Sequence, residues 1–431
     1  MFGRVFKSML ALAGSNALAM ILQLVSVPLL LSYWGAPYYG EWLVLFALPS
    51  FFMFSDLGLV NVASNDLENH YRRREYKKCK EVFFSTIVFI SFVFAFVAVL
   101  LALSAKIIAS FIDYPFSHIS NSEAFYSFLL LYVAVYLNLI INFASSSFRC
   151  VGRYHITIIY QTVARFFFTF SLLISAVLGG KAVLSSFLMM FSLLLVAFVL
   201  FALIRGSVRH VIPKKTTFSW FYIRSSMVGS IAFMLLPISN AIYLQGSLIV
   251  VGALFGSQIV AVFNSLRLLT RCGGQLVSIL GRSLWSEVNR LNSNGDLLKV
   301  RELLNKVLRV MPFAVLLYFL LGLLCGESVF KLWVGDSLEF DKRLFGFLLI
   351  YSAVMAVWQI LEVFLLSVNK HTRYSFVFFA TTFISVVVSA VCAGLMGVYS
   401  FPIWSSVFGG WVCVFLLMEI NKVYVVSCQR V

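Results

Sequence analysis

The sequence predicts an all-α integral membrane protein with twelve transmembrane helices in two six-helix lobes. Its 431 residues are 61% hydrophobic and only 12% charged, and the mean hydropathy is +0.97. A soluble core of this length does not need so much apolar sequence. Apolar stretches of about 20 residues, the length of a helix that crosses a bilayer, recur along the chain. The pattern of the first six stretches begins again in the second half.

Twelve stretches are predicted to cross the membrane. They are 9–32, 39–62, 83–104, 124–147, 156–178, 183–204, 226–254, 257–285, 306–326, 344–367, 374–394 and 399–420. The first follows Arg4 and Lys7 as a signal peptide would, but its apolar part is too long and no small-residue cleavage site follows it. We therefore expect it to remain as the first helix.

The distribution of positive charge orients the chain. Of 33 Lys and Arg residues, 23 fall on the side that holds both termini, five fall on the other side and five lie within spans. Cytoplasmic loops are enriched in Lys and Arg, so both termini are predicted to be cytoplasmic. The net charge of +16 is mostly this topology signal and does not indicate nucleic acid binding. The basic run at 72–80 could also contact anionic headgroups.

The two halves align as a repeat. An offset of 221 residues carries Gly35 onto Gly256, and Glu75 and Lys78 onto Asp296 and Lys299. The predicted lobes are residues 1–204 and 224–431, joined by a cytoplasmic linker at 205–223. Six spans return the chain to the same side, so the repeat is parallel, and its interface is the natural place for a transport path.

Two arginines deep in the span at 257–285 are the strongest candidate site residues. Arg267 falls about 15 Å from the start of its span, near the bilayer centre. An arginine there costs about 2.5–3.5 kcal/mol. Arg267, Arg271 and Gln275 share one helical face, so we expect a polar or aqueous surface beside them. The arginine at 282 is close enough to the cytoplasmic end to snorkel.

Other polar residues within the spans have two interpretations. They line a substrate cavity, or they only join helices through hydrogen bonds, which is the commoner role of such side chains. Arg165, buried in its span, either belongs to the cavity or pairs with Glu362. Asp56, Glu362 and Glu41 are candidates for ion coupling, although Asp56 and Glu41 also suit helix ends. The uncharged cavity candidates are Asn16, Gln23, Asn138, Asn142, Asn240, Gln275 and Gln359.

Cofactor and metal chemistry have no support in the sequence. The seven cysteines are scattered, so neither a disulfide framework nor a metal cluster is expected. The chain lacks a GxxxxGK[ST] phosphate loop, which argues against ATP hydrolysis. We expect no cofactor, and energy from a proton gradient, a sodium gradient or the membrane potential.

Residues 23–59, QLVSVPLLLSYWGAPYYGEWLVLFALPSFFMFSDLGL, resemble the opening of O-antigen flippases. These Wzx-type translocases of lipid-linked oligosaccharides belong to the multidrug/oligosaccharidyl-lipid/polysaccharide (MOP) exporter superfamily. The matching features are Gln23 and Pro28, the G-x-x-x-Y-G turn at 35–40 followed by Trp42, and the DLGL run at 56–59. The helix count, the basic loops and the short outer loops extend the resemblance along most of the chain.

The resemblance implies a MATE-like transporter whose two lobes form a V around a central cavity and alternate between inward-open and outward-open states. It implies a bacterial inner-membrane flippase of surface polysaccharide (O-antigen, lipopolysaccharide) synthesis. Its substrate would be an oligosaccharide on undecaprenyl pyrophosphate, moved from the cytoplasmic to the periplasmic leaflet. Polysaccharide polymerase and chain-length regulator proteins would be partners. Arg267, Arg271 and Arg165 would then bind the pyrophosphate, because arginine pairs with phosphate oxygens through a charged fork.

Two other functions compete with this interpretation. An exporter of organic cations could use the same fold, but a cationic cavity opposes such substrates. A membrane polysaccharide polymerase or ligase would need a substantial outer loop with catalytic residues. The outer segments at 105–123 and 327–343 are short and lack a convincing acid/base or nucleophile arrangement.

The orientation can be tested by labelling single cysteines with a membrane-impermeant reagent. Lys77→Cys and Lys299→Cys are expected to react only from the cytoplasmic side, and Asp336→Cys only from the periplasmic side, because the charge asymmetry orients the spans. Labelling of the first two from outside intact cells would overturn the topology.

Overall fold

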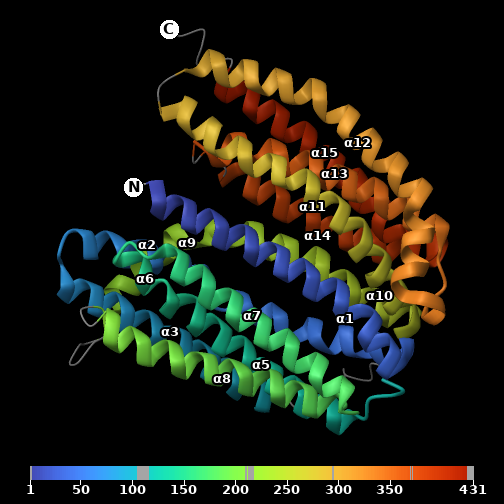
Figure 1. The fold of residues 1–431 in the computed structure, drawn as a ribbon, viewed down its shortest axis with the longest axis horizontal. Helices are drawn as coiled ribbons and strands as arrows, with labels where there is room; N and C mark the ends of the chain where they lie inside the picture. Colours follow the sequence, from blue (N-terminus) through green and yellow to red (C-terminus); the bar gives the residue numbers. More distant parts are fainter. Residues whose placement is uncertain are drawn as a thin grey trace. The chain divides into compact units, whose positions relative to one another are not determined.

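The computed structural model describes residues 2–103, 116–208, 211, 218–293, 296–368, 370 and 372–424. Within these residues the secondary structure is helical, and the chain forms two compact units, Met1–Met234 and Leu235–Val431 (Figure 1). The division falls inside one helix, whereas the sequence places the boundary in a linker at 205–223. Much of that linker lies outside the described residues, so the predicted lobe boundaries remain a prediction.

Unit 1 is a bundle in which the helix near residue 130 packs against the helix near residue 195, and both contact the helix near residue 165. Its elements are α1 (Phe2–Ser50), η1 (Phe51–Phe54), α2 (Leu59–Arg72), α3 (Tyr76–Leu103), α5 (Asn121–Ser145), α6 (Ser147–Cys150), α7 (Tyr154–Val177), α8 (Ala182–Ser207) and the first part of α9 (Trp220–Ala241).

The predicted span at 39–62 is not one continuous helix. The helix α1 ends at Ser50, the 3₁₀ turn η1 follows, and the separate helix α2 begins at Leu59. Leu57 and Gly58 both have positive φ, 52° and 77°. A Cβ on Gly58 would lie 2.6 Å from the carbonyl oxygen of Ser230 in α9, so only glycine fits where these segments meet.

Unit 2 is centred on α13, which packs against both α11 and α15. Its elements are the π-helix η2 (Ile242–Gly246), α10 (Ser247–Phe255), α11 (Ser257–Ser293), α12 (Leu297–Val334), η3 (Gly335–Ser337), α13 (Lys342–Leu366), α14 (Thr372–Met396), η4 (Gly397–Tyr399) and α15 (Ser400–Tyr424). The π-helix follows Pro237 in α9, which cannot donate a helical hydrogen bond.

Backbone and side-chain details repeat between the units as the 221-residue offset predicts. Gly35 has φ 72° and ψ 164°, and Gly256 has φ 81° and ψ 172°. Each glycine separates two membrane helices. Lys78 pairs with Glu75 at 3.2 Å, and Lys299 pairs with Asp296 at 2.9 Å. Glu75 also accepts a hydrogen bond from His70. This hydrogen bond and the nearby Lys78 ammonium both lower the pKa of Glu75.

Buried serines allow the membrane helices to approach closely. Ser185, Ser192 and Ser389 are at most 8% exposed. Ser389 and Ser192 donate to carbonyl oxygens three or four residues earlier in their own helices, while Ser185 donates to Ser175 on the neighbouring helix at 2.9 Å. Small residues whose hydroxyls are satisfied suit helix packing in lipid, where burial of apolar side chains does not by itself drive association.

Nine segments of the described chain are long and apolar enough to cross a membrane. Two of them, Leu10–Phe54 and Thr372–Tyr424, have 45 and 53 residues, enough for two crossings each. The arginine-containing α11, with 37 residues, is a further long helix. These helices account for the twelve predicted spans.

Valine at Gly256 is expected to lower the free energy of unfolding by about 1–3 kcal/mol, because φ near 81° with extended ψ is open almost only to glycine. A Cβ there meets no atom within 4 Å, so the cost arises from the backbone alone. Unfolding in detergent measures it. Gly346→Ala, inside α13 with equally open space, is the control and should be neutral or stabilising. Equal stability of Gly256→Val and the unchanged protein would contradict the argument.

Candidate functional site

Arg267 on α11 is buried, with 4% of its surface exposed. Its Nη1 donates to Ser247 Oγ at 2.8 Å and its Nη2 to Asn264 Oδ1 at 3.1 Å. The guanidinium lies 5.1 Å from the ring centroid of Phe263 and 5.9 Å from that of Tyr243. Cation–π contacts in a desolvated place are worth about 2 kcal/mol. Hydroxyl, amide and aromatic groups therefore fix this cation and link α11 to the start of α10.

Arg271 lies one helical turn further along the same face and is only half-buried. Among the described residues it makes no ion pair or hydrogen bond. The two arginines therefore differ: Arg267 is held by its own unit, while the Arg271 guanidinium is available to an external anion. The side chain of Gln275, predicted on this face, lies outside the described residues.

The sequence suggested a buried ion pair between Arg165 and Glu362 as one alternative, with a cavity role for Arg165 as the other. The structure describes the surroundings of each side chain within its own unit. Arg165 on α7 is exposed on unit 1, so that unit does not enclose its side chain. Its depth in the span and its alternative roles stay predictions. Glu362 on α13 is half-buried and accepts a hydrogen bond from the Tyr374 hydroxyl at 2.8 Å. A neutral phenol in its own unit therefore partners this carboxyl group.

Of the six uncharged cavity candidates whose side chains the structure describes, three are exposed and three are half-buried. Asn16 and Gln23 on α1 are exposed, as is Asn240 on α9, which donates to the Leu236 carbonyl at 3.2 Å. Gln359 on α13 is half-buried. Among the candidates with described side chains, one pair is in contact: Asn142 Nδ2 donates to Asn138 Oδ1 at 3.0 Å on α5. Exposed amides within membrane helices are costly against lipid, so these faces suit water or a polar ligand.

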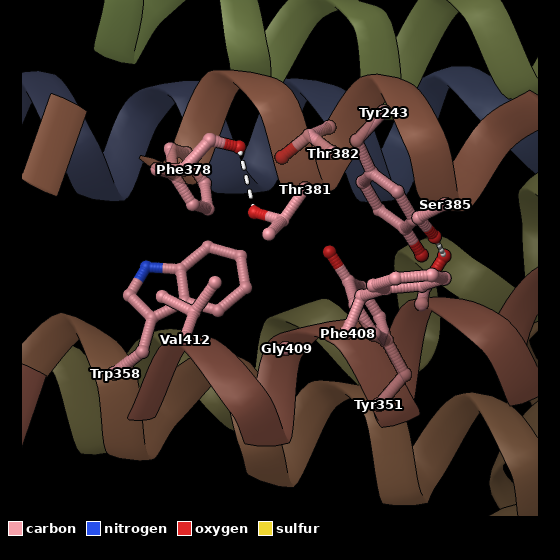
Figure 2. A pocket seen from close by; sticks show the side chains of 11 residues that line it. Tyr243, Tyr351, Trp358, Phe378, Thr381, Thr382, Ser385, Phe408, Gly409 and Val412 are labelled. Atoms are coloured by element: carbon pink, nitrogen blue, oxygen red, sulfur yellow. Dashed lines mark hydrogen bonds between the residues drawn. The ribbon is translucent and has the colours of Figure 1, made fainter. Parts of the chain in front are cut away.

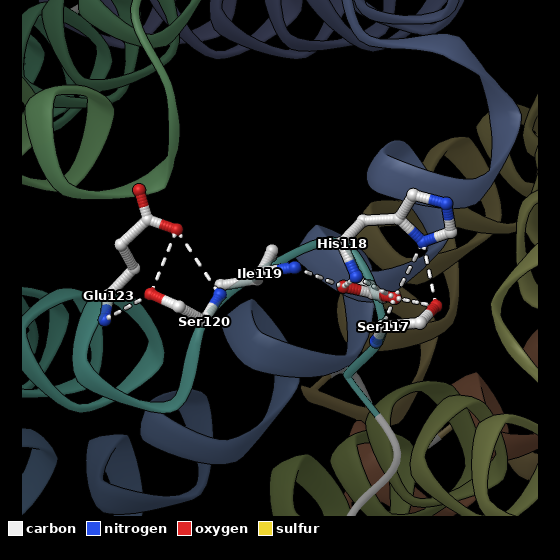
Figure 3. Close-up of polar contacts among 6 residues, drawn as sticks. Ser117, His118, Ile119, Ser120 and Glu123 are labelled. Carbon is white, nitrogen blue, oxygen red and sulfur yellow. Dashed lines mark hydrogen bonds and ion pairs between the residues drawn. The ribbon is translucent and has the colours of Figure 1, made fainter.

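Glu41 holds the segment that precedes α5. Its carboxylate is fully buried and accepts the backbone N–H groups of Ser117, His118 and Ile119 at 2.8, 3.0 and 2.7 Å. Figure 3 shows this segment continuing into the capping box between Ser120 and Glu123 at the start of α5. These contacts favour a structural role for Glu41.

Asp56 caps the broken second span. It is 6% exposed and accepts the N–H groups of Gly58 at 3.2 Å and Val60 at 2.9 Å, which start α2. Its carboxylate therefore satisfies orphan donors of a helix that begins inside the bundle. This position explains the aspartate without ion coupling, which remains a hypothesis.

A small cavity inside unit 2 was missed by the sequence reasoning. Its volume is about 20 Å³, room for about one water molecule, and side chains from η2, α13, α14 and α15 line it (Figure 2). Aromatic walls come from Tyr243, Tyr351, Trp358, Phe378 and Phe408, and hydroxyls from Thr381, Thr382, Ser385 and Ser405. Along a membrane helix these residue types look like ordinary packing, so no pattern in the sequence distinguishes them.

The described residues contain no group of three His, Cys, Asp or Glu side chains that could hold a metal ion. The cysteines in the described part of the chain are unbridged. The candidate site is therefore built from arginines, amides, hydroxyls and aromatic rings.

The sequence matches no protein-family model and no curated protein. The structure, however, is similar to the inward-facing conformation of a multidrug resistance MATE family transporter of the MOP superfamily. The TM-score is 0.68 at 12% identity, over 94% of this chain and 95% of that one. It is similar to the lipid II flippase MurJ in an inward closed conformation, with a TM-score of 0.68 at 13% identity, over 96% and 88%. The eukaryotic MATE transporter AtDTX14 gives 0.60 at 14% identity, over 97% and 95%.

The chain is thus an all-α, multi-span membrane protein with the MATE-like fold found in transporters of the MOP superfamily. This confirms the predicted fold class. Identities of 12–14% establish the fold and leave the substrate to be argued from this chain's own residues.

Glu41→Gln is expected to lower the free energy of unfolding by about 1.5–3 kcal/mol, since hydrogen bonds to a charged acceptor contribute about that much. Thermal unfolding in detergent measures the loss. Glu123→Gln is the matched control, because glutamine also serves in a capping box and Glu123 is partly exposed. Equal effects of the two substitutions would mean that the buried carboxylate does not anchor the segment.

Proposed function

We propose that this protein is a flippase that moves an oligosaccharide linked to undecaprenyl pyrophosphate across the bacterial inner membrane, from the cytoplasmic to the periplasmic leaflet. The observation that carries the proposal is the arginine pair on α11. Arg267 is fixed by neutral groups, and Arg271 is half-exposed without a described carboxylate partner. Two adjacent cations at membrane depth call for an anionic ligand.

Pyrophosphate suits this pair chemically. It concentrates negative charge on oxygens that a guanidinium can bind through two parallel hydrogen bonds. Arg271 would make the direct contact, and Arg267 would hold the local potential positive. Arg165, exposed on unit 1, stays a further predicted pyrophosphate ligand.

The other two parts of the substrate also have suitable surroundings. Sugar hydroxyls need hydrogen-bonding groups, which the exposed Asn16, Gln23 and Asn240 offer. The polyprenyl chain is as apolar as lipid and can remain in the bilayer. The similarity of the fold to a lipid II flippase supports a lipid-linked substrate.

Export of organic cations is the second candidate, since the fold is shared with multidrug transporters. The positive potential of Arg267 and Arg271 disfavours it, because like charges raise the cost of binding. A polymerase or ligase is disfavoured by the fold similarity to transporters and flippases. In the flippase proposal the termini are cytoplasmic, and polymerase and chain-length regulator proteins act on the product.

Variants of the arginines test the proposal when binding and flipping are measured per folded molecule in proteoliposomes. Arg271→Ala is expected to weaken binding of undecaprenyl-pyrophosphate oligosaccharide about tenfold or more with little change in stability. Arg271→Glu should weaken binding further, since it repels the anion. Arg267→Ala should also destabilise the protein by about 1.5–3 kcal/mol, because its hydrogen bonds are buried.

Arg271→Lys separates charge from geometry: partial binding means that charge suffices, and loss as deep as in alanine means that the bidentate fork is needed. Organic cations serve as the competing substrates in the same vesicles. Normal affinity for the lipid-linked oligosaccharide in a well-folded Arg267→Ala, Arg271→Ala double variant would end the assignment.

Ion coupling is tested at Asp56 and Glu362. If a proton drives the cycle, Asp56→Asn or Glu362→Gln should reduce transport while substrate binding is largely kept, because only a group that ionises can carry the proton. Flipping is followed at several pH values. Unchanged pH dependence in both variants would exclude these residues as carriers, and the contacts of Asp56 would then be purely structural.

A further inference from the structure

Two consecutive glycines follow the arginines of α11 and let two other helices approach it closely. A Cβ on Gly273 would lie 2.5 Å from Cε2 of Tyr318 in α12, and a Cβ on Gly274 would lie 2.7 Å from Oγ of Ser352 in α13. Real Cβ atoms essentially never approach other atoms so closely, so a larger residue at either position would push α12 or α13 away. The two glycines therefore keep Tyr318 and Ser352 against this part of α11.

Both of these side chains bind the same backbone atom. The Tyr318 hydroxyl donates to the Thr270 carbonyl oxygen at 2.9 Å, and the Ser352 hydroxyl donates to it at 3.0 Å. Thr270 and Ser352 are each 3% exposed. Two hydroxyls from two helices thus converge on one carbonyl at membrane depth, where water does not compete for them. We call Thr270, Gly273, Gly274, Tyr318 and Ser352 the Thr270 junction.

The Thr270 junction belongs to the turn of α11 that carries both arginines. Thr270 Oγ1 donates to the Arg267 carbonyl at 3.0 Å, and the Arg267 guanidinium donates to Ser247 of α10 at 2.8 Å. Arg271 is the next residue after Thr270. Hydrogen bonds with α10, α12 and α13 therefore fix the rotation and the depth of this turn.

The turn needs such support because glycine weakens a helix. Glycine loses more backbone freedom on folding than any other residue, so two in succession make α11 easy to bend just after Arg271. Among the described residues Arg271 makes no ion pair or hydrogen bond, so the backbone of its turn decides where its guanidinium points. The side chain is long, and a small rotation of the helix moves the guanidinium much further than the Cα. Bidentate binding of an anion tolerates little misplacement.

We propose that Tyr318 and Ser352 are positioning residues of the anion site: by holding the Thr270 carbonyl, they keep the Arg271 guanidinium directed at the pyrophosphate. The inference rests on the proposed flippase function. Neither side chain touches the substrate in this proposal, so both act through Arg271. In the alternative, ordinary helix packing, the two hydroxyls contribute to stability alone.

The test removes the two hydroxyls from the purified full chain with Tyr318→Phe, Ser352→Ala and the double variant. Affinity for undecaprenyl-pyrophosphate oligosaccharide is measured per folded molecule, with and without the further substitution Arg271→Ala. Hydrogen exchange of the backbone amides of 267–274 is measured on the same proteins without the lipid. Tyr132→Phe in unit 1, whose hydroxyl donates to the Phe94 carbonyl of a neighbouring helix at 2.7 Å, is the matched control.

Each single variant is expected to weaken lipid binding about threefold, and the double variant about tenfold. When Arg271→Ala is already present, the same substitutions should change the affinity by less than about twofold, because they act through that arginine. Amide exchange in 267–274 should become faster in the double variant, since the turn opens more easily. Tyr132→Phe should change neither the affinity nor this exchange.

Two failures are distinguishable. If the exchange becomes faster but the unchanged protein does not bind the lipid, the Thr270 junction stands as the support of the arginine turn and the flippase function is wrong. If the lipid binds and the double variant keeps full affinity, the two hydroxyls do not position Arg271. An equal loss of affinity in the Arg271→Ala background would also overturn the inference, because the hydroxyls would then act without that arginine. Unchanged exchange in the double variant would do the same, since the turn would not depend on them.

Discussion

The structure depends on one constraint: a polar group within hydrocarbon must find its partners inside the protein. Asp56 meets it by accepting the first N–H groups of α2, and Glu41 by accepting three consecutive N–H groups before α5. Ser192 and Ser389 meet it within their own helices, and Ser185 meets it with Ser175 on the neighbouring helix. Arg267 meets it with Ser247, Asn264 and two aromatic rings.

The breaks in the helices obey the same constraint. A helix that stops inside a bundle leaves N–H and C=O groups unpaired, so other groups at each break must bind them. At 51–58 the Asp56 carboxylate accepts the Gly58 N–H, and the chain turns at Gly58, where Ser230 leaves no room for a side chain. Gly35 and Gly256 make equivalent breaks without a crowded neighbour, so the unusual backbone angles themselves require glycine.

The proposed site combines a rigid cation with an accessible one. Arg267 is buried and bonded to Ser247 and Asn264, whereas Arg271, one turn further along α11, is half-buried. Tyr243, whose ring contacts the Arg267 guanidinium, also lines the small cavity of hydroxyls and rings in unit 2.

By itself the sequence determined the class of protein and the approximate positions of the spans, because hydropathy is a local property of the chain. It also predicted the parallel repeat and a role for the α11 arginines. It predicted Gly35 and Gly256 as equivalents, and their backbone angles agree. Tertiary structure decided which polar groups have hydrogen-bond partners. Glu362 accepts a hydrogen bond from the Tyr374 hydroxyl, Glu41 accepts backbone N–H groups, and Arg165 is exposed. Only packing also brings Tyr243, Thr382 and Trp358 from three helical elements to one cavity, since Tyr243 is more than a hundred positions from the other two.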